Sequence, residues 1–151
     1  MKQSEYKKYR WFFTSSNKLI IGGKSAEQNE NLLIKLKKQK EDYTIMHTVF
    51  PGSPFTAILS KKSQTASDLK QAAIFTACFS KQWKLNKKKT EIHIFNLSQI
   101  YKTKEMKTGT LGVKGKIKKV QAELQLILTR QKNTLRAVPP QTPESKSQIL
   151  L

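Results

Sequence analysis

The segment from Leu69 to Lys81 constrains the fold most, because apolar residues occupy most of the circumference of the helix that it predicts. Thr65, followed three residues later by Asp68, supplies a capping signal just before it. A helix that is apolar on nearly every side has to be covered by other elements, so we expect it to lie buried against a sheet. The chain has 151 residues, of which 37% are hydrophobic, and this suffices for one domain with its own core.

The rest of the sequence predicts strands and one more main helix. Ser25, followed three residues later by Gln28, forms a capping-box pattern that opens a helix running to Lys38. Alternating or β-rich runs bounded by turn residues predict strands at 9–14, 18–21, 43–49, 55–60, 91–96, 111–116 and 122–129. The first two strands and the next two are expected to pair as hairpins. We therefore predict an α+β fold, in which two main helices pack on a mostly antiparallel sheet within a single domain.

The two ends of the chain differ in composition from the middle. Residues 1–7 form a basic N-terminal extension, and residues 8–130 hold the predicted elements. Residues 131–151 are expected to be a flexible tail, because several prolines stand there among Gln, Thr, Ser and Lys.

The charge is strongly positive and unevenly distributed. The 29 Lys and Arg residues outnumber the 10 Asp and Glu residues, which gives a formal net charge of +19. Residues 1–40 carry +7 and residues 81–130 carry +10, whereas residues 41–80 are neutral and residues 131–151 carry +2. Such an excess indicates a polyanionic partner, either nucleic acid or an anionic membrane, although lysines can also serve only to solvate a surface. Because 26 of the 29 cations are lysine, contacts to phosphates are favoured over reading of base edges.

Several classes of protein are excluded or disfavoured. No stretch approaches the roughly twenty apolar residues of a membrane span, so no integral membrane association is expected. The basic start leads directly into Trp11 without a signal-type apolar region, which favours a cytoplasmic location. A single cysteine, Cys78, rules out an internal disulfide framework or a cysteine cluster, and we expect it to be buried.

Gly23-Lys24-Ser25 resembles the end of a phosphate-binding P-loop. The full motif needs a glycine at position 18, where this chain has Lys18. Two interpretations remain open: a tight turn into a capped helix, or a single phosphate site formed by Lys24 and the helix N-terminus.

Residues with catalytic chemistry are sparse. His47 and His93 lie in predicted strands, and Ser53 lies in a proline-glycine turn without assignable partners. We therefore expect structural roles for them, no metal or cofactor, and no enzymatic activity. Trp83, beside Lys84, is either a stacking platform for a base or a cap of the core at a helix end. Farther along, the Lys114–Lys119 segment alternates basic residues with others, which would place several lysines on one face of a strand.

A resemblance to a known family adds to these observations. The opening of the chain resembles the start of the NFACT RNA-binding domain, the NFACT-R module, and further blocks follow in the same order over about residues 8–120. The matching segments are Tyr9–Ser15, Leu19–Lys24, Gln28–Glu30, His47–Pro54, Gln71–Ser80 with Trp83-Lys84, Ser98–Thr103 and Thr108–Lys116. The chain departs from the family pattern at the Ser16-Asn17-Lys18 turn and at Lys116, where the family often has arginine.

The resemblance implies an α+β module that binds RNA without catalysis. In large members of the family this module accompanies an N-terminal domain, a helix-hairpin-helix domain and a coiled coil. Those proteins bind tRNA and the large ribosomal subunit of stalled complexes in ribosome-associated quality control. A chain of 151 residues has no room for the other domains, so it resembles a stand-alone version, and some stand-alone versions are linked to tRNA modification.

Charge and resemblance together lead to one main hypothesis, namely binding of structured RNA, either tRNA or ribosomal RNA. Alternatives are an accessory role in tRNA modification, with the chemistry supplied by a partner, and general adhesion to polyanions such as DNA or anionic membranes. The residues expected to contact RNA are Lys24, Lys102, Lys104, Lys107, Lys114, Lys116 and Lys118, together with Trp83 as a stacking residue.

Overall fold

A computed structural model of the chain describes residues 4–50, 53–60, 63–141 and 149–150. Within them, the largest element is a six-stranded sheet in which every neighbouring pair is antiparallel. Its strands, in spatial order, are β1 (Arg10–Phe13), β2 (Leu19–Gly22), β4 (Thr56–Ile58), β3 (Thr44–Thr48), β5 (Lys89–Asn96) and β8 (Lys118–Glu123). Both predicted hairpins, β1–β2 and β3–β4, are present. The α+β class is confirmed.

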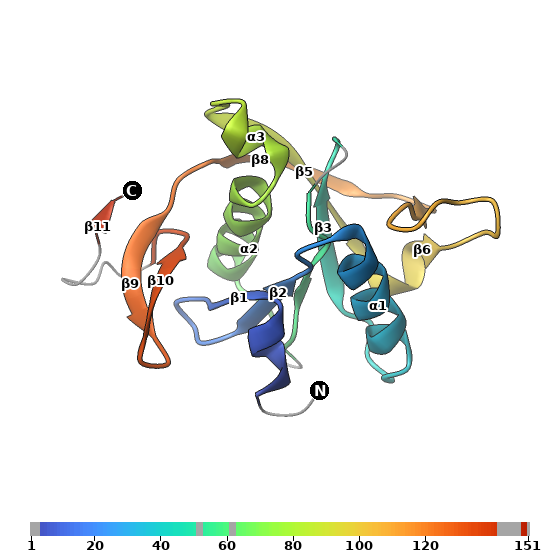
Figure 1. Ribbon diagram of the computed structural model, residues 1–151, viewed down its shortest axis with the longest axis horizontal. Helices are drawn as coiled ribbons and strands as arrows, with labels where there is room; N and C mark the ends of the chain where they lie inside the picture. The colour runs from blue at the N-terminus through green and yellow to red at the C-terminus, as the bar shows by residue number, and fades with distance from the viewer. Residues whose placement is uncertain (1–3, 51–52, 61–62, 142–148, 151) are drawn as a thin grey trace.

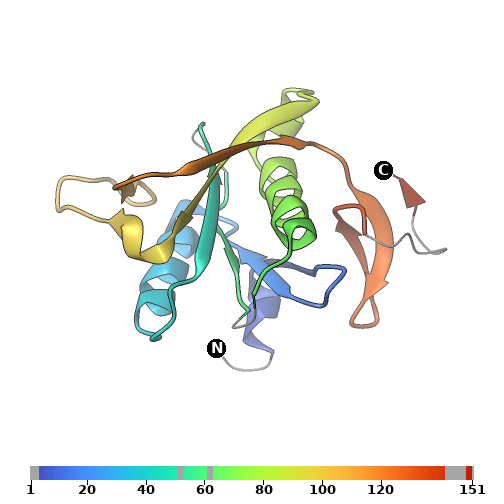
Figure 2. The ribbon, with the colours of Figure 1, turned by 180° about the vertical axis from the view of Figure 1, so that it is seen from behind.

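The two main helices pack on opposite faces of this sheet. Helix α1 (Ala26–Lys37) buries Leu32, Leu33 and Leu36 in one core cluster. Helix α2 (Ala66–Cys78) lies in a second cluster. Neighbouring strand residues divide between the two, so that Ile20 faces α2 and Ile21 faces α1. Figures 1 and 2 show the helices on either side of the sheet, in views from front and back.

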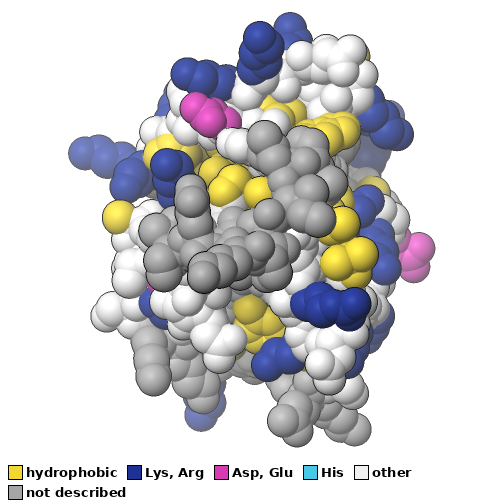
Figure 3. Space-filling model, turned by 90° about the vertical axis from the view of Figure 1, so that its left-hand side faces the viewer, with side chains coloured by type: hydrophobic (Ala, Val, Ile, Leu, Met, Phe, Trp, Pro, Cys, Tyr) yellow, Lys and Arg dark blue, Asp and Glu magenta, His cyan; other side chains and the backbone are white. Residues whose placement is uncertain are grey.

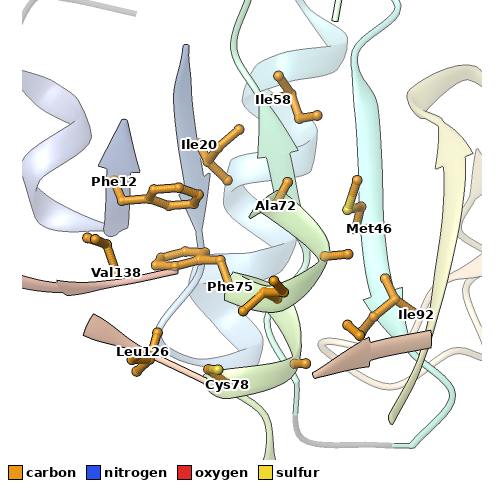
Figure 4. Packing of buried hydrophobic residues seen from close by; sticks show 14 of the residues in the cluster. Phe12, Ile20, Met46, Ile58, Ala72, Phe75, Cys78, Ile92, Leu126 and Val138 are labelled. Atoms are coloured by element: carbon orange, nitrogen blue, oxygen red, sulfur yellow. The ribbon is translucent and has the colours of Figure 1, made fainter. Parts of the chain in front are cut away.

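Helix α2 is also covered on its other side. A second sheet, ordered β10–β9–β11, consists of β9 (Ile127–Gln131), β10 (Thr134–Val138) and β11 (Ile149–Leu150). Leu126 and Val138 from this region belong to the same core cluster as Phe75 and Cys78 of α2, and Figure 4 shows them around the helix. This double cover confirms the expected burial of the apolar helix.

The predicted start of α2 is confirmed, but its predicted end is wrong. Thr65 and Asp68 form a complete capping box. The helix stops at Cys78, because the Ser80 hydroxyl donates back to the Ala77 carbonyl (2.6 Å) and accepts from the Gln82 amide (3.2 Å). Ser80 thereby caps a separate short helix, α3 (Lys81–Lys84).

The single strand predicted over residues 122–129 is also wrong. The chain leaves the six-stranded sheet at Glu123 and enters the small sheet at Ile127. Between them, the Leu124 amide still donates to the carbonyl of Lys88 in the register of the ladder (3.0 Å), so the pairing with β5 ends one residue after Glu123. Alternation of leucines could not reveal this break, because Leu126 is buried in both arrangements.

The predicted flexible tail is wrong for residues 131–141. Lys132 and Asn133 have positive φ angles of 52° and 61°, which suit a tight hairpin turn, and β10 returns along β9. Val138 is fully buried in the core. The remainder of the predicted tail, residues 142–148 and 151, lies outside the described residues.

Short elements complete the fold. A 3₁₀ turn, η1 (Glu5–Lys8), packs Tyr6 edge-on against Trp11, so part of the predicted basic extension covers the core. The predicted strand at 111–116 is reduced to β7 (Gly112–Val113), which pairs with β6 (Ile100–Tyr101) just after η2 (Leu97–Gln99). Among the described residues, no helix is long and apolar enough to cross a membrane.

A buried ion pair ties the first hairpin to α2. The Asp68 carboxylate, which is completely buried, accepts from the Lys18 ammonium and from the Ser16 hydroxyl, both at 2.5 Å. Burial alone would raise the pKa of Asp68, but these donors and the Thr65 amide outweigh it and hold the pKa well below its usual value. The helix start and the turn between β1 and β2 are thus fixed to each other.

Replacing Asp68 by alanine should lower the free energy of unfolding by about 3 kcal/mol, because the Lys18 ammonium would stay largely buried without a counter-charge. Chemical denaturation of both proteins at neutral pH measures this difference. Since the native carboxyl has a depressed pKa, its contribution is present above the ordinary carboxyl pKa and is lost as the pH falls below it. The difference in the free energy of unfolding between the wild-type protein and the Asp68→Ala variant should therefore become smaller in acid. A Lys18→Met/Asp68→Leu double variant that is as unstable as the sum of its single variants would contradict the pairing.

Candidate nucleic-acid interface

A pocket opens at the end of the sheet where β2 and β3 finish and β1 and β4 begin. It has a volume of about 480 Å³, and we call it the α1 pocket because the first turn of α1 forms part of its wall. Its lining residues are Arg10, Gly23, Lys24, Ser25, Ala26, Asn29, His47, Val49, Ser53, Pro54, Phe55, Phe79, His93, Phe95, Gly109, Thr110, Leu111 and Val113. None of these is acidic, so the pocket suits an anion.

The first turn of α1 carries the P-loop-like residues. Ser25 is the N-cap, and its hydroxyl accepts from the Gln28 amide (3.1 Å). The Gln28 side chain accepts from the Lys24 amide (2.7 Å), so the second half of the predicted capping box reaches one residue earlier than expected. The amides of Ala26 and Glu27 precede the first intrahelical hydrogen bond and remain available for an anion. The capped turn is therefore present, and it leaves two backbone amides that can bind an anion beside the exposed Lys24.

The loop between β6 and β7 folds over this helix start. The Glu30 carboxylate accepts from the Gly109 amide (2.7 Å) and pairs with the Lys102 ammonium (3.3 Å). The Gly109 hydrogen bond is the main reason that the pKa of Glu30 is lowered. Gly109 has a φ of +84°, and a Cβ there would come within 2.5 Å of Ala26, so only glycine allows this approach.

The Lys102 side chain stabilises the same loop through hydrogen bonds to its backbone. Its ammonium donates to the carbonyls of Lys107 and Thr110 as well as to Glu30, which uses all three of its donors. In this state Lys102 shapes the loop and has no donor left for RNA. The side chains of Lys104 and Lys107, on the same loop, are exposed.

The Gln99 side chain holds the backbone at Lys114 and Lys116. Its side-chain amide donates to the carbonyls of Lys114 and Lys116, both at 2.8 Å, and Gly115 between them has a φ of +82°. The expectation that lysines from 114 onward share one strand face is therefore wrong, because β8 begins only at Lys118. The side chains of Lys114, Lys116 and Lys118 are all exposed.

His47 and Arg10 line the α1 pocket, and sequence reasoning did not connect either with binding. The His47 ring stacks on Phe55, with 4.2 Å between centroids and 19° between planes. Burial lowers the pKa of His47 to about 4, so its ring is neutral at pH 7. The Arg10 guanidinium lies over the Phe79 ring (4.8 Å), and its Nε is buried without a hydrogen-bond partner. The residues of this pocket come from segments that are far apart in the sequence and meet only in the folded chain. No spacing in the sequence therefore indicates the site.

Trp83 lies elsewhere, on α3, and its side chain is 40% exposed. It borders an open groove together with Lys87, Lys88 and Lys89. This exposure argues against the alternative in which Trp83 caps the core.

Positive charge extends to another face too: in Figure 3, Lys and Arg side chains lie around hydrophobic side chains on the side of β9 and β10.

The structure thus groups the predicted residues only in part. Lys24 and the 102–110 loop meet at the start of α1, where Glu30 joins them, and the lysines after Gly112 continue from β7 toward β8. Trp83 belongs to a separate groove.

Comparisons with known proteins agree on one relationship. Residues 8–115 match the model of a protein family described as the NFACT protein RNA binding domain. The ribosome quality control complex subunit NEMF homolog of Drosophila melanogaster is 26% identical over 117 residues, which are 74% of this chain and 12% of that protein. The chain therefore spans a small part of that relative. The C-terminal part of the fibronectin/fibrinogen-binding protein from Streptococcus suis (FBPS) superposes with a TM-score of 0.66 at 22% identity, over 76% of this chain and 44% of that one, which shows a shared fold.

Replacing Glu30 by alanine should loosen the 102–110 loop without unfolding the domain, because the Gly109 amide and Lys102 would lose their shared acceptor. Hydrogen exchange of the Gly109 amide should become at least tenfold faster, as the closed loop opens more often. Glu27→Ala is the matched control, since Glu27 is an exposed carboxylate on the same helix. Unchanged protection of Gly109 in the Glu30 variant would show that other contacts hold the loop.

The His47 ring should titrate with a midpoint near 4, because charging it inside the pocket wall beside His93 is unfavourable. The ring-nitrogen shifts of His47, followed by NMR from pH 7 to 3, measure this. The unfolded chain takes up the proton nearer 6.5, so this histidine should reduce stability as the pH falls from 6.5 toward 4. A midpoint above 6 would mean that the ring is solvated.

Proposed function

This chain belongs to the family of the NFACT protein RNA binding domain, and from that membership we propose that it binds structured RNA, either tRNA or ribosomal RNA, through phosphate contacts. The family match supports the proposal most, because net charge alone would equally favour DNA or an anionic membrane. The chain resembles a relative that is named as a subunit of the ribosome quality control complex. We extend the proposal to cytoplasmic RNA of the large ribosomal subunit on this basis.

The proposed contacts come from exposed lysines around the α1 pocket and the β7–β8 connection. They are Lys24, Lys104, Lys107, Lys114, Lys116 and Lys118. Lys102 enters the proposal as the residue that shapes the loop bearing Lys104 and Lys107. Because lysine acts as a point charge on a flexible stem, this surface suits the backbone of a folded RNA better than a particular base sequence. Trp83, with its neighbouring lysines, offers a second place where a base can stack.

The pocket residues with catalytic chemistry are engaged in the fold, which supports binding without catalysis. The Ser53 hydroxyl is buried and accepts from the Thr48 amide (3.2 Å). His93 is bonded to Glu91 (2.9 Å), and His47 stacks on Phe55. Within the described part of the chain, no three His, Cys, Asp or Glu residues lie close enough together to hold a metal ion.

The affinity for tRNA should fall steeply with salt, because bound phosphates release counterions to the solution. Six contacts would give a slope of about −5 in a plot of log affinity against log salt concentration. The Lys114→Glu/Lys116→Glu variant should bind at least tenfold more weakly, with a slope reduced by about 2. Fluorescence anisotropy with labelled tRNA between low and moderate salt measures both quantities.

Arg130→Glu is the matched control, since Arg130 is exposed on β9, at the other end of the molecule from β7 (Figure 1). It should leave affinity nearly unchanged. A salt-independent affinity would remove phosphate contacts from the mechanism. Equal displacement of tRNA by duplex DNA, at equal phosphate concentration, would instead indicate general polyanion binding.

A further inference from the structure

We propose that the α1 pocket receives one unpaired nucleotide of the bound RNA, with its base against the wall that contains His47 and its phosphate between Arg10 and Lys24. This inference rests on the proposed function, because it names the part of the RNA that this pocket recognises. It adds a base-binding site to the lysine surface around the pocket, whose proposed contacts are to phosphates.

The size and lining of the pocket suit a nucleotide. A volume of about 480 Å³ lies in the range of small-molecule sites and far exceeds the needs of a single phosphate ion. Much of the wall is apolar, formed by Val49, Phe55, Phe79, Phe95, Leu111 and Val113. A free phosphate gains nothing from such a wall, whereas the flat face of a base does.

The wall offers an uncharged ring for stacking. His47 is packed on Phe55 on one side and borders the pocket, so its ring is held in a fixed orientation. Because burial keeps the ring neutral at pH 7, it offers an uncharged aromatic surface there. His93 is the residue on β5 that pairs with His47 on β3, and its ring is hydrogen-bonded to the Glu91 carboxylate.

The cationic side of the pocket suits a phosphate. Arg10 lines the pocket, and its guanidinium brings a positive charge to this side. Lys24 is exposed beside the free amides of the first turn of α1, where the helix dipole also favours negative charge. The described lining residues include no carboxylate that would repel an anion.

An unpaired nucleotide fits this combination better than a duplex. In a helix, the base faces are stacked on each other, and only unstacked bases of loops, bulges and ends can enter an aromatic pocket. The lysines around the pocket would meanwhile hold the paired region by its backbone. The two contacts together predict a preference for a paired stem with a single-stranded end or bulge.

The test compares two labelled hairpin RNAs, one with a blunt end and one with a short unpaired adenosine tail. The 151-residue chain should bind the tailed hairpin about tenfold more tightly, as one stacked base contributes on this scale. Arg10→Met keeps an apolar stem against Phe79 but removes the guanidinium, and it should abolish the preference, so that the tailed hairpin binds no more tightly than the blunt one. Arg130→Met, which replaces an exposed arginine on β9, should retain the preference.

A second variant and a second probe keep the test independent of folding. Val49→Trp introduces bulk at an exposed wall residue, and it should also remove the preference. AMP alone, followed by amide shifts in NMR, should perturb the Ala26 and Glu27 amides in the wild-type protein. AMP binding without any preference for the tailed RNA would overturn the RNA-end assignment and would indicate a free-nucleotide site.

The outcomes separate this inference from the proposed function. Tight and equal binding of both hairpins would overturn the pocket assignment and leave RNA binding intact. A preference for the tail that survives both Arg10→Met and Val49→Trp would place the base elsewhere and equally overturn it. Failure of both hairpins and of tRNA to bind would overturn the proposed function itself.

Discussion

The burial of helix α2 is the constraint on which the rest of the structure depends. Every residue of α2 from Gln71 to Cys78 is buried, so this part of the helix leaves no face for water. One sheet can cover only one side of a helix, and the second side needs its own layer. The chain provides that layer by leaving β8 and building β9 and β10 across the helix, which makes the small sheet part of the core.

The same packing determines where the candidate interface lies. Phe79 follows the end of α2 directly and meets Arg10 of β1, while Asp68 fixes the start of the helix to the β1–β2 turn. Helix α1, on the opposite face, presents its first turn at the same end of the sheet. The pocket therefore forms where rigid elements converge, and a single mobile loop is not responsible for its shape.

Prediction from sequence worked where the signal was local. Thr65 and Asp68 marked the start of α2, and both hairpins followed from alternation and turn residues. It failed where the local structure is determined by a contact with a residue far away in the sequence. The break after Glu123 depends on the packing of Leu126 and Ile127 in the core cluster of α2, and the carbonyls of Lys114 and Lys116 are held by Gln99. Arg10 and His47 form a site only because separate strand ends meet, and Lys102 looked available because its acceptors lie on a loop and on α1.

The inward-turned ammonium of Lys102 has a consequence for the thermodynamics of association. A loop that already satisfies its carbonyls loses little conformational freedom when a ligand arrives. This loop then need not fold when the complex forms, so it adds little to the heat-capacity change of binding and does not slow electrostatically guided encounter. In this respect the loop is preorganised for binding, in contrast to the basic segments of many RNA-binding proteins that become ordered only on binding.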